Sequence, residues 1–128
     1  MEANVVNPVD GIYRATEDYV HAMEVKNASR LLFIAGTMGL DADGMAPPSL
    51  NEQLALIWSN IQRILAEAEM TTENIVRLTS YLRDGSYADA NQAARLQALG
   101  KRRVPTTAIV VTTLSPDWLV EIEVVAAA

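Results

Sequence analysis

The sequence predicts a single α+β domain, residues 1–128, with the element order β-β-α-β-α-β-β. Two segments have the apolar spacing of amphipathic helices, and five shorter runs around them have the composition of strands. Half of the residues are hydrophobic, which suits one compact domain with its own core rather than two domains.

The two predicted helices differ in strength. In the segment 49–70, apolar residues recur at spacings of three and four: Leu50, Leu54, Ile57, Trp58, Ile61, Ile64, Leu65 and Ala68. Ser49 and Glu52 have the spacing of a capping box at its start. A shorter helix is predicted to begin at Ser86, with Asp89 as the reciprocal cap and Gly100 as the stop signal.

The predicted strands span 19–25, 31–36, 75–83, 106–114 and 118–126. The last two flank the turn-like "SPD" and therefore predict an antiparallel hairpin. In the final strand, Val120, Ile122 and Val124 alternate with Glu121, Glu123 and Val125. The strand before it is largely apolar on both sides, so we expect the second face of the sheet to be covered by self-association.

Composition excludes several classes of site. The chain has no cysteine and His21 is its only histidine, so thiolate chemistry and histidine-rich zinc sites are not expected. The net charge of −6 disfavours binding to phosphate backbones, and the basic run 101–103 is too short to reverse this. We expect no nucleic-acid partner and no metal.

No apolar stretch approaches the roughly 18 residues of a membrane span, and the N-terminal "MEANVVNPVDG" lacks the features of a signal peptide. We expect a soluble, cytoplasmic protein without a membrane partner.

No short motif is decisive alone; the glycines of "AGTMGLDADG", for example, do not form a dinucleotide fingerprint. An ordered series of segments is more specific: "YVHAMEV", "LLFIAGTMGLD", "QLALIWSNIQRILAEAEMTTENIVRLTSYLRD", "YADAN", "RVPTTA" and "VEIEVVA". In this order the chain resembles, over almost its whole length, the YjgF/RidA group of reactive intermediate deaminases.

The resemblance implies a chorismate-mutase-like fold and a homotrimer whose sheets form a central barrel, with ligand clefts between subunits. It also implies hydrolysis of enamines or imines of small 2-amino acids to keto acids and ammonia, without metal or cofactor.

Site residues follow from the same resemblance. Tyr19 matches the cleft tyrosine, Asn91 an asparagine of the second helix, and Glu121 the glutamate that holds the attacking water. Ala35 and Gly36 match a Ser-Gly pair at the cleft floor, so the serine is absent here.

The largest departure from the family pattern is Thr107, which stands where the deaminases have an arginine that grips the substrate carboxylate. One neutral hydroxyl in place of a charged fork is expected to cost about ten- to a hundredfold in binding. Ile109, on the same strand, is expected to contact the ligand through its backbone. Whether Arg14, Arg102 or Arg103 replaces the missing charge stays open.

Plainer interpretations stay open beside these. Glu121 and Glu123 also fit the solvated side of an edge strand, and Asn91 fits a helix residue bonded to nearby backbone. Two functions are therefore carried forward: an enamine/imine deaminase with an altered substrate range, or a non-catalytic protein that binds or senses a small metabolite. A ribonuclease, an activity attached to some relatives, is disfavoured by the acidic charge.

Overall fold

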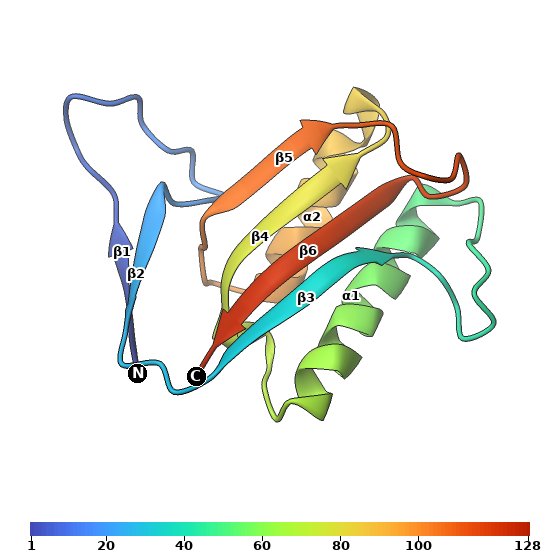
Figure 1. Ribbon diagram of the computed structural model, residues 1–128. Helices are drawn as coiled ribbons and strands as arrows, with labels where there is room; N and C mark the ends of the chain where they lie inside the picture. Colours follow the sequence, from blue (N-terminus) through green and yellow to red (C-terminus); the bar gives the residue numbers. More distant parts are fainter.

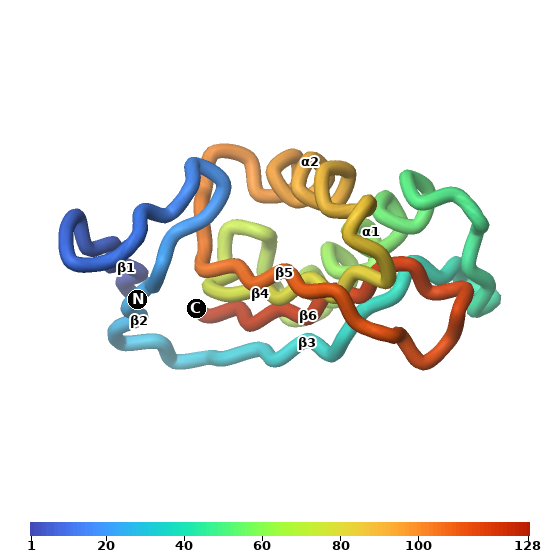
Figure 2. The backbone as a smooth tube through the Cα atoms, turned by 90° about the horizontal axis from the view of Figure 1, so that it is seen from above, coloured from blue at the N-terminus to red at the C-terminus, as the bar shows by residue number.

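The computed structural model describes residues 1–128 and places two helices on one face of a four-stranded sheet, with a separate hairpin beside it (Figures 1 and 2). The elements are β1 Glu2–Val6, β2 Ala22–Lys26, β3 Leu31–Met38, α1 Leu50–Glu67, β4 Ile75–Leu82, α2 Ala88–Leu99, β5 Thr106–Val110 and β6 Val120–Ala127. Short 3-10 turns, Thr72–Asn74 and Gly85–Tyr87, precede β4 and α2. The expected α+β class is confirmed.

The strand order β3-β6-β4-β5 shows that the predicted terminal hairpin is wrong. β6 pairs antiparallel with both β3 and β4, whereas β5 pairs parallel with β4 at the edge of the sheet (Figure 1). Parallel neighbours need a crossover, and α2 supplies it between β4 and β5. β6 takes the central place because Val120, Ile122 and Val124 bury completely against the helices.

The predicted strand 106–114 also ends early, at Val110. Thr113 is buried and donates its hydroxyl to Trp118 O at 2.7 Å, and Arg83 Nη1 donates to Thr113 Oγ1 at 2.8 Å. These bonds hold the chain in a loop that carries it from β5 to β6.

The N-terminal strand β1 was not predicted, and the expectation of one sheet is wrong. β1 pairs antiparallel with β2, and the two form their own sheet. The predicted strand at 19–25 is β2, which begins three residues later. An isolated parallel bridge between Val20 and Pro105 connects this region to the beginning of β5.

α1 begins as its sequence predicts but ends at Glu67, three residues before the predicted end at 70. α2 ends at the predicted glycine but begins at Ala88, later than predicted. Ser49 Oγ accepts a bond from Glu52 N at 3.3 Å, as expected of the N-cap. The predicted cap at Ser86 and Asp89 is wrong: Asp84 accepts from Ser86 N at 2.8 Å and caps the 3-10 turn before α2. Gly100, at φ +65°, ends α2.

The hydrophobic core lies between the helices and one sheet face, where Ile57, Ile61 and Leu65 of α1 are completely buried. The opposite sheet face, called here the open face, has no element of the chain over it (Figure 2). Phe33 is 73% exposed and Ile109 is 47% exposed there. The bare second face expected from the sequence is therefore present.

Candidate site on the open face of the sheet

Strand register brings three of the candidate residues onto the open face. Tyr81 of β4 pairs with Glu121 of β6 on one side and with Ile109 of β5 on the other. Thr79, two residues earlier, pairs in the same way with Glu123 and Thr107. Since residues two apart on a strand share a face, Glu121, Thr107 and Ile109 all belong to this surface, spread over about 10 Å, two strand spacings.

A β-bulge places Ala35 and Gly36 beside them. Ile34 pairs with Val124 and Thr37 with Ile122, so Ala35 and Gly36 together stand opposite the single residue Glu123. A Cβ built on Gly36 would lie 3.0 Å from Oε1 of Glu121. The Glu121 carboxylate therefore lies over a glycine that leaves it room.

The two acids of the open face have different environments. The Tyr81 hydroxyl donates to Glu123, and this bond raises the pKa of Tyr81. Glu121 takes part in no ion pair or side-chain hydrogen bond, and burial raises its pKa above the ordinary 4.5. A half-buried carboxylate with free oxygens and a raised pKa is suited to hold a water molecule and accept its proton.

Tyr19 lies outside the sheet, in the segment before β2. Its neighbour Val20 bridges to Pro105, which places this segment beside the first residues of β5. The Tyr19 ring meets the His21 ring edge-on, with centroids 5.9 Å apart, and His21 Nε2 lies 2.8 Å from Tyr13 O. Tyr19 is thus brought near the strand that carries Thr107.

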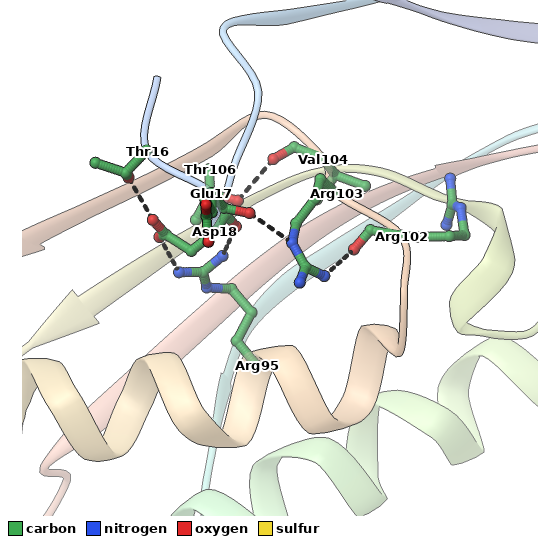
Figure 3. A network of polar contacts seen from close by, with 8 residues as sticks. All are labelled: Thr16, Glu17, Asp18, Arg95, Arg102, Arg103, Val104 and Thr106. Atoms are coloured by element: carbon green, nitrogen blue, oxygen red, sulfur yellow. Dashed lines mark hydrogen bonds and ion pairs between the residues drawn. The ribbon is translucent and has the colours of Figure 1, made fainter. Parts of the chain in front are cut away.

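Arginine side chains fix the segment that precedes Tyr19 (Figure 3). Arg95 of α2 donates to Asp18 O at 2.6 Å and to Asp18 Oδ2 at 2.8 Å. Arg103 Nε donates to Glu17 O at 2.8 Å. Sequence reasoning missed Arg95. A single arginine on the buried side of a helix indicates an ion pair only when its partner is known, and that partner is distant in sequence.

Two of the three cations considered as replacements for the missing arginine are bonded to main-chain carbonyls. Arg102 donates to Thr72 O at 3.0 Å and to Ile75 O at 2.9 Å, and Arg103 bonds to three main-chain carbonyls. Arg14 is exposed in the loop between β1 and β2. A different arginine, Arg77, is on the open face, because its partner in β6 is Val125.

Asn91 is not brought to the open face. It is 2% exposed on α2, which packs against the other side of the sheet (Figure 2). The local backbone bond considered from the sequence is not formed, since Asn91 Oδ1 has no hydrogen-bond partner. Within one chain, Asn91 and Glu121 are therefore separated by the sheet.

No three His, Cys, Asp or Glu side chains gather in a way that could hold a metal ion. None of the helices is both long enough and apolar enough to cross a bilayer.

Fold and site together define a class: a small α+β domain with helices on one sheet face and an unpaired acid beside a bulge on the other. The sequence profile of the family described as Endoribonuclease L-PSP matches residues 12–128, and the chain belongs to this family.

Individual relatives agree with this membership. A RutC family protein of Pyrococcus abyssi is 29% identical over 111 residues, which are 84% of each chain. A solved structure from Yersinia pestis, described as a protein of unknown function of the conserved Rid family, YyfB, superposes with a TM-score of 0.85 at 27% identity over the full length of both chains. A member of the YjgF/YER057c/UK114 family from Mycobacterium tuberculosis gives a TM-score of 0.69 at 26% identity, covering 99% of this chain and all of the other. The expected YjgF/RidA membership is confirmed.

Proposed function

We propose that the protein hydrolyses small enamines or imines to a carbonyl compound and ammonia, with an altered substrate range. The observation that carries the proposal is Glu121, a half-buried carboxylate with no protein partner, over the Ala35–Gly36 bulge on the open face. Such a group loses part of its hydration without gaining a cation, which is costly for stability and useful for catalysis.

The proposed reaction needs one base and one water molecule. Glu121 accepts a proton from water as the water oxygen bonds to the imine carbon and the C=N π electrons move to nitrogen. Glu121 then returns this proton to the nitrogen, which gives a carbinolamine. In the second step the carbinolamine hydroxyl gives its proton through Glu121 to the same nitrogen, its oxygen electrons form the C=O bond, the C–N bond breaks, and the carbonyl compound and ammonia leave. Thr107 and the backbone around Ile109 border the ligand, and Tyr19 closes its side.

The same proposal includes assembly into a homotrimer through the open face. Exposed Leu31, Phe33 and Ile109 give this face an apolar surface that one chain leaves in water. Assembly would also close the site, because within one chain Glu121 has no wall opposite it. Sedimentation of the purified protein at dilute concentration tests this, and a stable monomer contradicts it.

Ammonia release from freshly generated 2-aminoacrylate tests the activity. Glu121→Gln is expected to lower turnover by about 10²- to 10⁴-fold, the usual contribution of a positioned acid or base. Glu67→Gln is the matched control, because it removes the same charge from an exposed position of α1, on the other side of the sheet. Equal turnover in wild type and Glu121→Gln removes Glu121 from the mechanism.

A second candidate, a protein that binds a metabolite without converting it, is favoured by Ala35 and Thr107, which supply neither of the two polar groups expected at those positions. Ammonia release no faster than the uncatalysed blank, together with saturable ligand binding, selects this candidate.

Ribonuclease activity, named in the family description, conflicts with a net charge of −6. The ribonuclease candidate would be supported if the wild-type protein bound RNA in a salt-sensitive way and cleaved it, and if Glu121→Gln lost the cleavage.

A further inference from the structure

Arg77 is a free cation on the open face, near the beginning of the inner strand β4. Of the eight arginines, five donate to protein oxygens: Arg30, Arg83, Arg95, Arg102 and Arg103. Arg77 makes no hydrogen bond and no ion pair, and its side chain is exposed. Arg14 and Arg63 also donate to no protein oxygen, but Arg14 is in a loop and Arg63 is on α1. Arg77 is therefore the one arginine of these three that lies on a strand.

A cavity of about 330 Å³ lies directly around Arg77. Its lining includes Phe33, Ala35, Arg77, Thr79, Glu123 and Val125, so apolar walls surround one cation, one hydroxyl and one acid. A mainly apolar hollow with a few convergent polar groups is the usual form of a small-molecule site, and this volume suits a small metabolite.

The acid in the cavity does not neutralise Arg77. The Glu123 carboxylate accepts the Tyr81 hydroxyl, and no ion pair joins it to Arg77. The charge of Arg77 nevertheless acts on Tyr81 and lowers its pKa, opposing the larger effect of the Glu123 bond. The guanidinium and the phenol therefore share the open face, and the positive charge of Arg77 is available to a ligand.

Strand register places Arg77 next to the position where the charge is missing. Thr79 pairs with Thr107, and Arg77 precedes Thr79 by two residues on the same face, a distance of about 7 Å along the strand. The long arginine side chain can span such a step. A guanidinium also offers the two-pronged donor that a carboxylate prefers, whereas Thr107 offers one neutral hydroxyl.

We propose that Arg77 binds the carboxylate of a small organic anion in this cavity, and so supplies the charge that Thr107 lacks. Thr79 adds a neutral hydroxyl group, and Phe33 and Val125 form the apolar wall. The class of ligand rests on the proposed function; the site itself rests on Arg77 and the cavity.

The test measures binding without turnover, so that it is separate from the deaminase assay. Isothermal titration of the full-length protein with 2-oxobutanoate is compared with titration with 2-oxobutanamide, which has the same shape and no charge. Arg77→Gln is expected to weaken 2-oxobutanoate binding by about ten- to a hundredfold and to leave amide binding unchanged. Arg77→Lys, which keeps the charge without the fork, should lie between the two.

Arg14→Gln is the matched control, because it removes the same charge from an exposed loop. The inference is overturned if Arg77→Gln binds 2-oxobutanoate as wild type does, if Arg14→Gln weakens it equally, or if wild type does not prefer the acid to the amide. Circular dichroism and sedimentation of each variant show whether it keeps the wild-type fold and assembly. If Arg77→Gln fails this check, Arg77→Lys decides: wild-type affinity for both probes overturns the inference, and selective weakening of the acid supports it. If Glu121→Gln loses ammonia release but still binds 2-oxobutanoate, the result supports both the role of Glu121 in hydrolysis and carboxylate binding by Arg77.

Discussion

Arg95 of α2 and Asp18 of the segment before β2 form a largely buried ion pair, with 2.8 Å between Nη2 and Oδ2. Their side chains are 5% and 19% exposed. The pair joins residues that are 77 positions apart and fixes the chain that leads into Tyr19 (Figure 3). A contact of this kind matters most when one partner is removed, because the other charge is then left without compensation.

Asp18→Ala is therefore expected to destabilise the protein by about 2–3 kcal/mol at neutral pH, the lower part of the range for broken buried pairs, because Asp18 keeps some contact with water. Urea unfolding followed by circular dichroism measures the change. Asp43→Ala, at an exposed loop position, is the control and should stay within about 0.5 kcal/mol of wild type. Equal effects of the two substitutions would contradict this account.

The same pair predicts a pH dependence. Burial alone would raise the pKa of Asp18, but the bonds from Thr16 and Arg95 together outweigh it and hold the pKa below 3.8. Because the folded pKa is depressed, this contribution to stability is present above pH 3.8 and is lost as the pH falls through the folded value. The free energy of unfolding of Asp18→Asn should fall less steeply than that of wild type in this acid range.

Glu121 is expected to give a pH dependence of stability opposite in sign to that of Asp18. Burial raises its pKa, so the folded state binds the proton more tightly than the unfolded state, and stability is lost as the pH rises from about 4.5 through the folded value. Glu121→Gln should consequently be more stable than wild type at pH 7 and equal to it below pH 4. Thermal melts at both pH values measure this; a neutral-pH loss of stability in Glu121→Gln would mean that the carboxylate has a stabilising partner.

Two glycines predict different results of the same substitution. A Cβ on Gly39 would lie 2.4 Å from Gln53 O and 2.6 Å from Gln53 Cα, and this backbone of α1 cannot move aside cheaply. Gly39→Ala is expected to cost about 3 kcal/mol or to prevent folding.

At Gly36 the nearest atom is the end of the flexible Glu121 side chain, 3.0 Å away. Gly36→Ala should keep most of the stability and displace the carboxylate, so that turnover falls while the melting temperature changes little.

Restoring the missing arginine is a direct test of the rest of the site. Thr107 and Glu121 share the open face, so Thr107→Arg would place a guanidinium on the surface that holds the proposed base. In an Arg77→Gln background, which lacks the charge proposed to replace the missing arginine, we expect about a ten- to hundredfold gain in kcat/KM on 2-imino acids. Thr112→Arg, an exposed position beyond the end of β5, controls for added charge. A Thr107→Arg protein that is folded and no more active would show that more than this charge is missing.

Much of the architecture could be predicted from local pattern. The helix predicted over 49–70 is present at Leu50–Glu67. The alternation of Val120, Ile122 and Val124 with Glu121 and Glu123 is present in β6. Both follow from the spacing of residues along the chain. Pairing partners are not a local property, so the SPD turn suggested a hairpin that the parallel β4–β5 pair replaces. The cap at Asp84 was missed because Ser86 and Asp89 offered an equally good local signal.

For the candidate site, the sequence by itself determined which residue types are present: an acid at 121, no arginine at 107, no cysteine and a net charge of −6. Only the tertiary structure decided which of them meet. It put Arg77, Thr107 and Glu121 on one sheet face, placed Asn91 beyond the sheet and tied Arg102 and Arg103 to backbone carbonyls. The physical reason is that alternation along a strand fixes which residues share a face, while register across strands, set by burial and by the crossover, fixes which residues become neighbours.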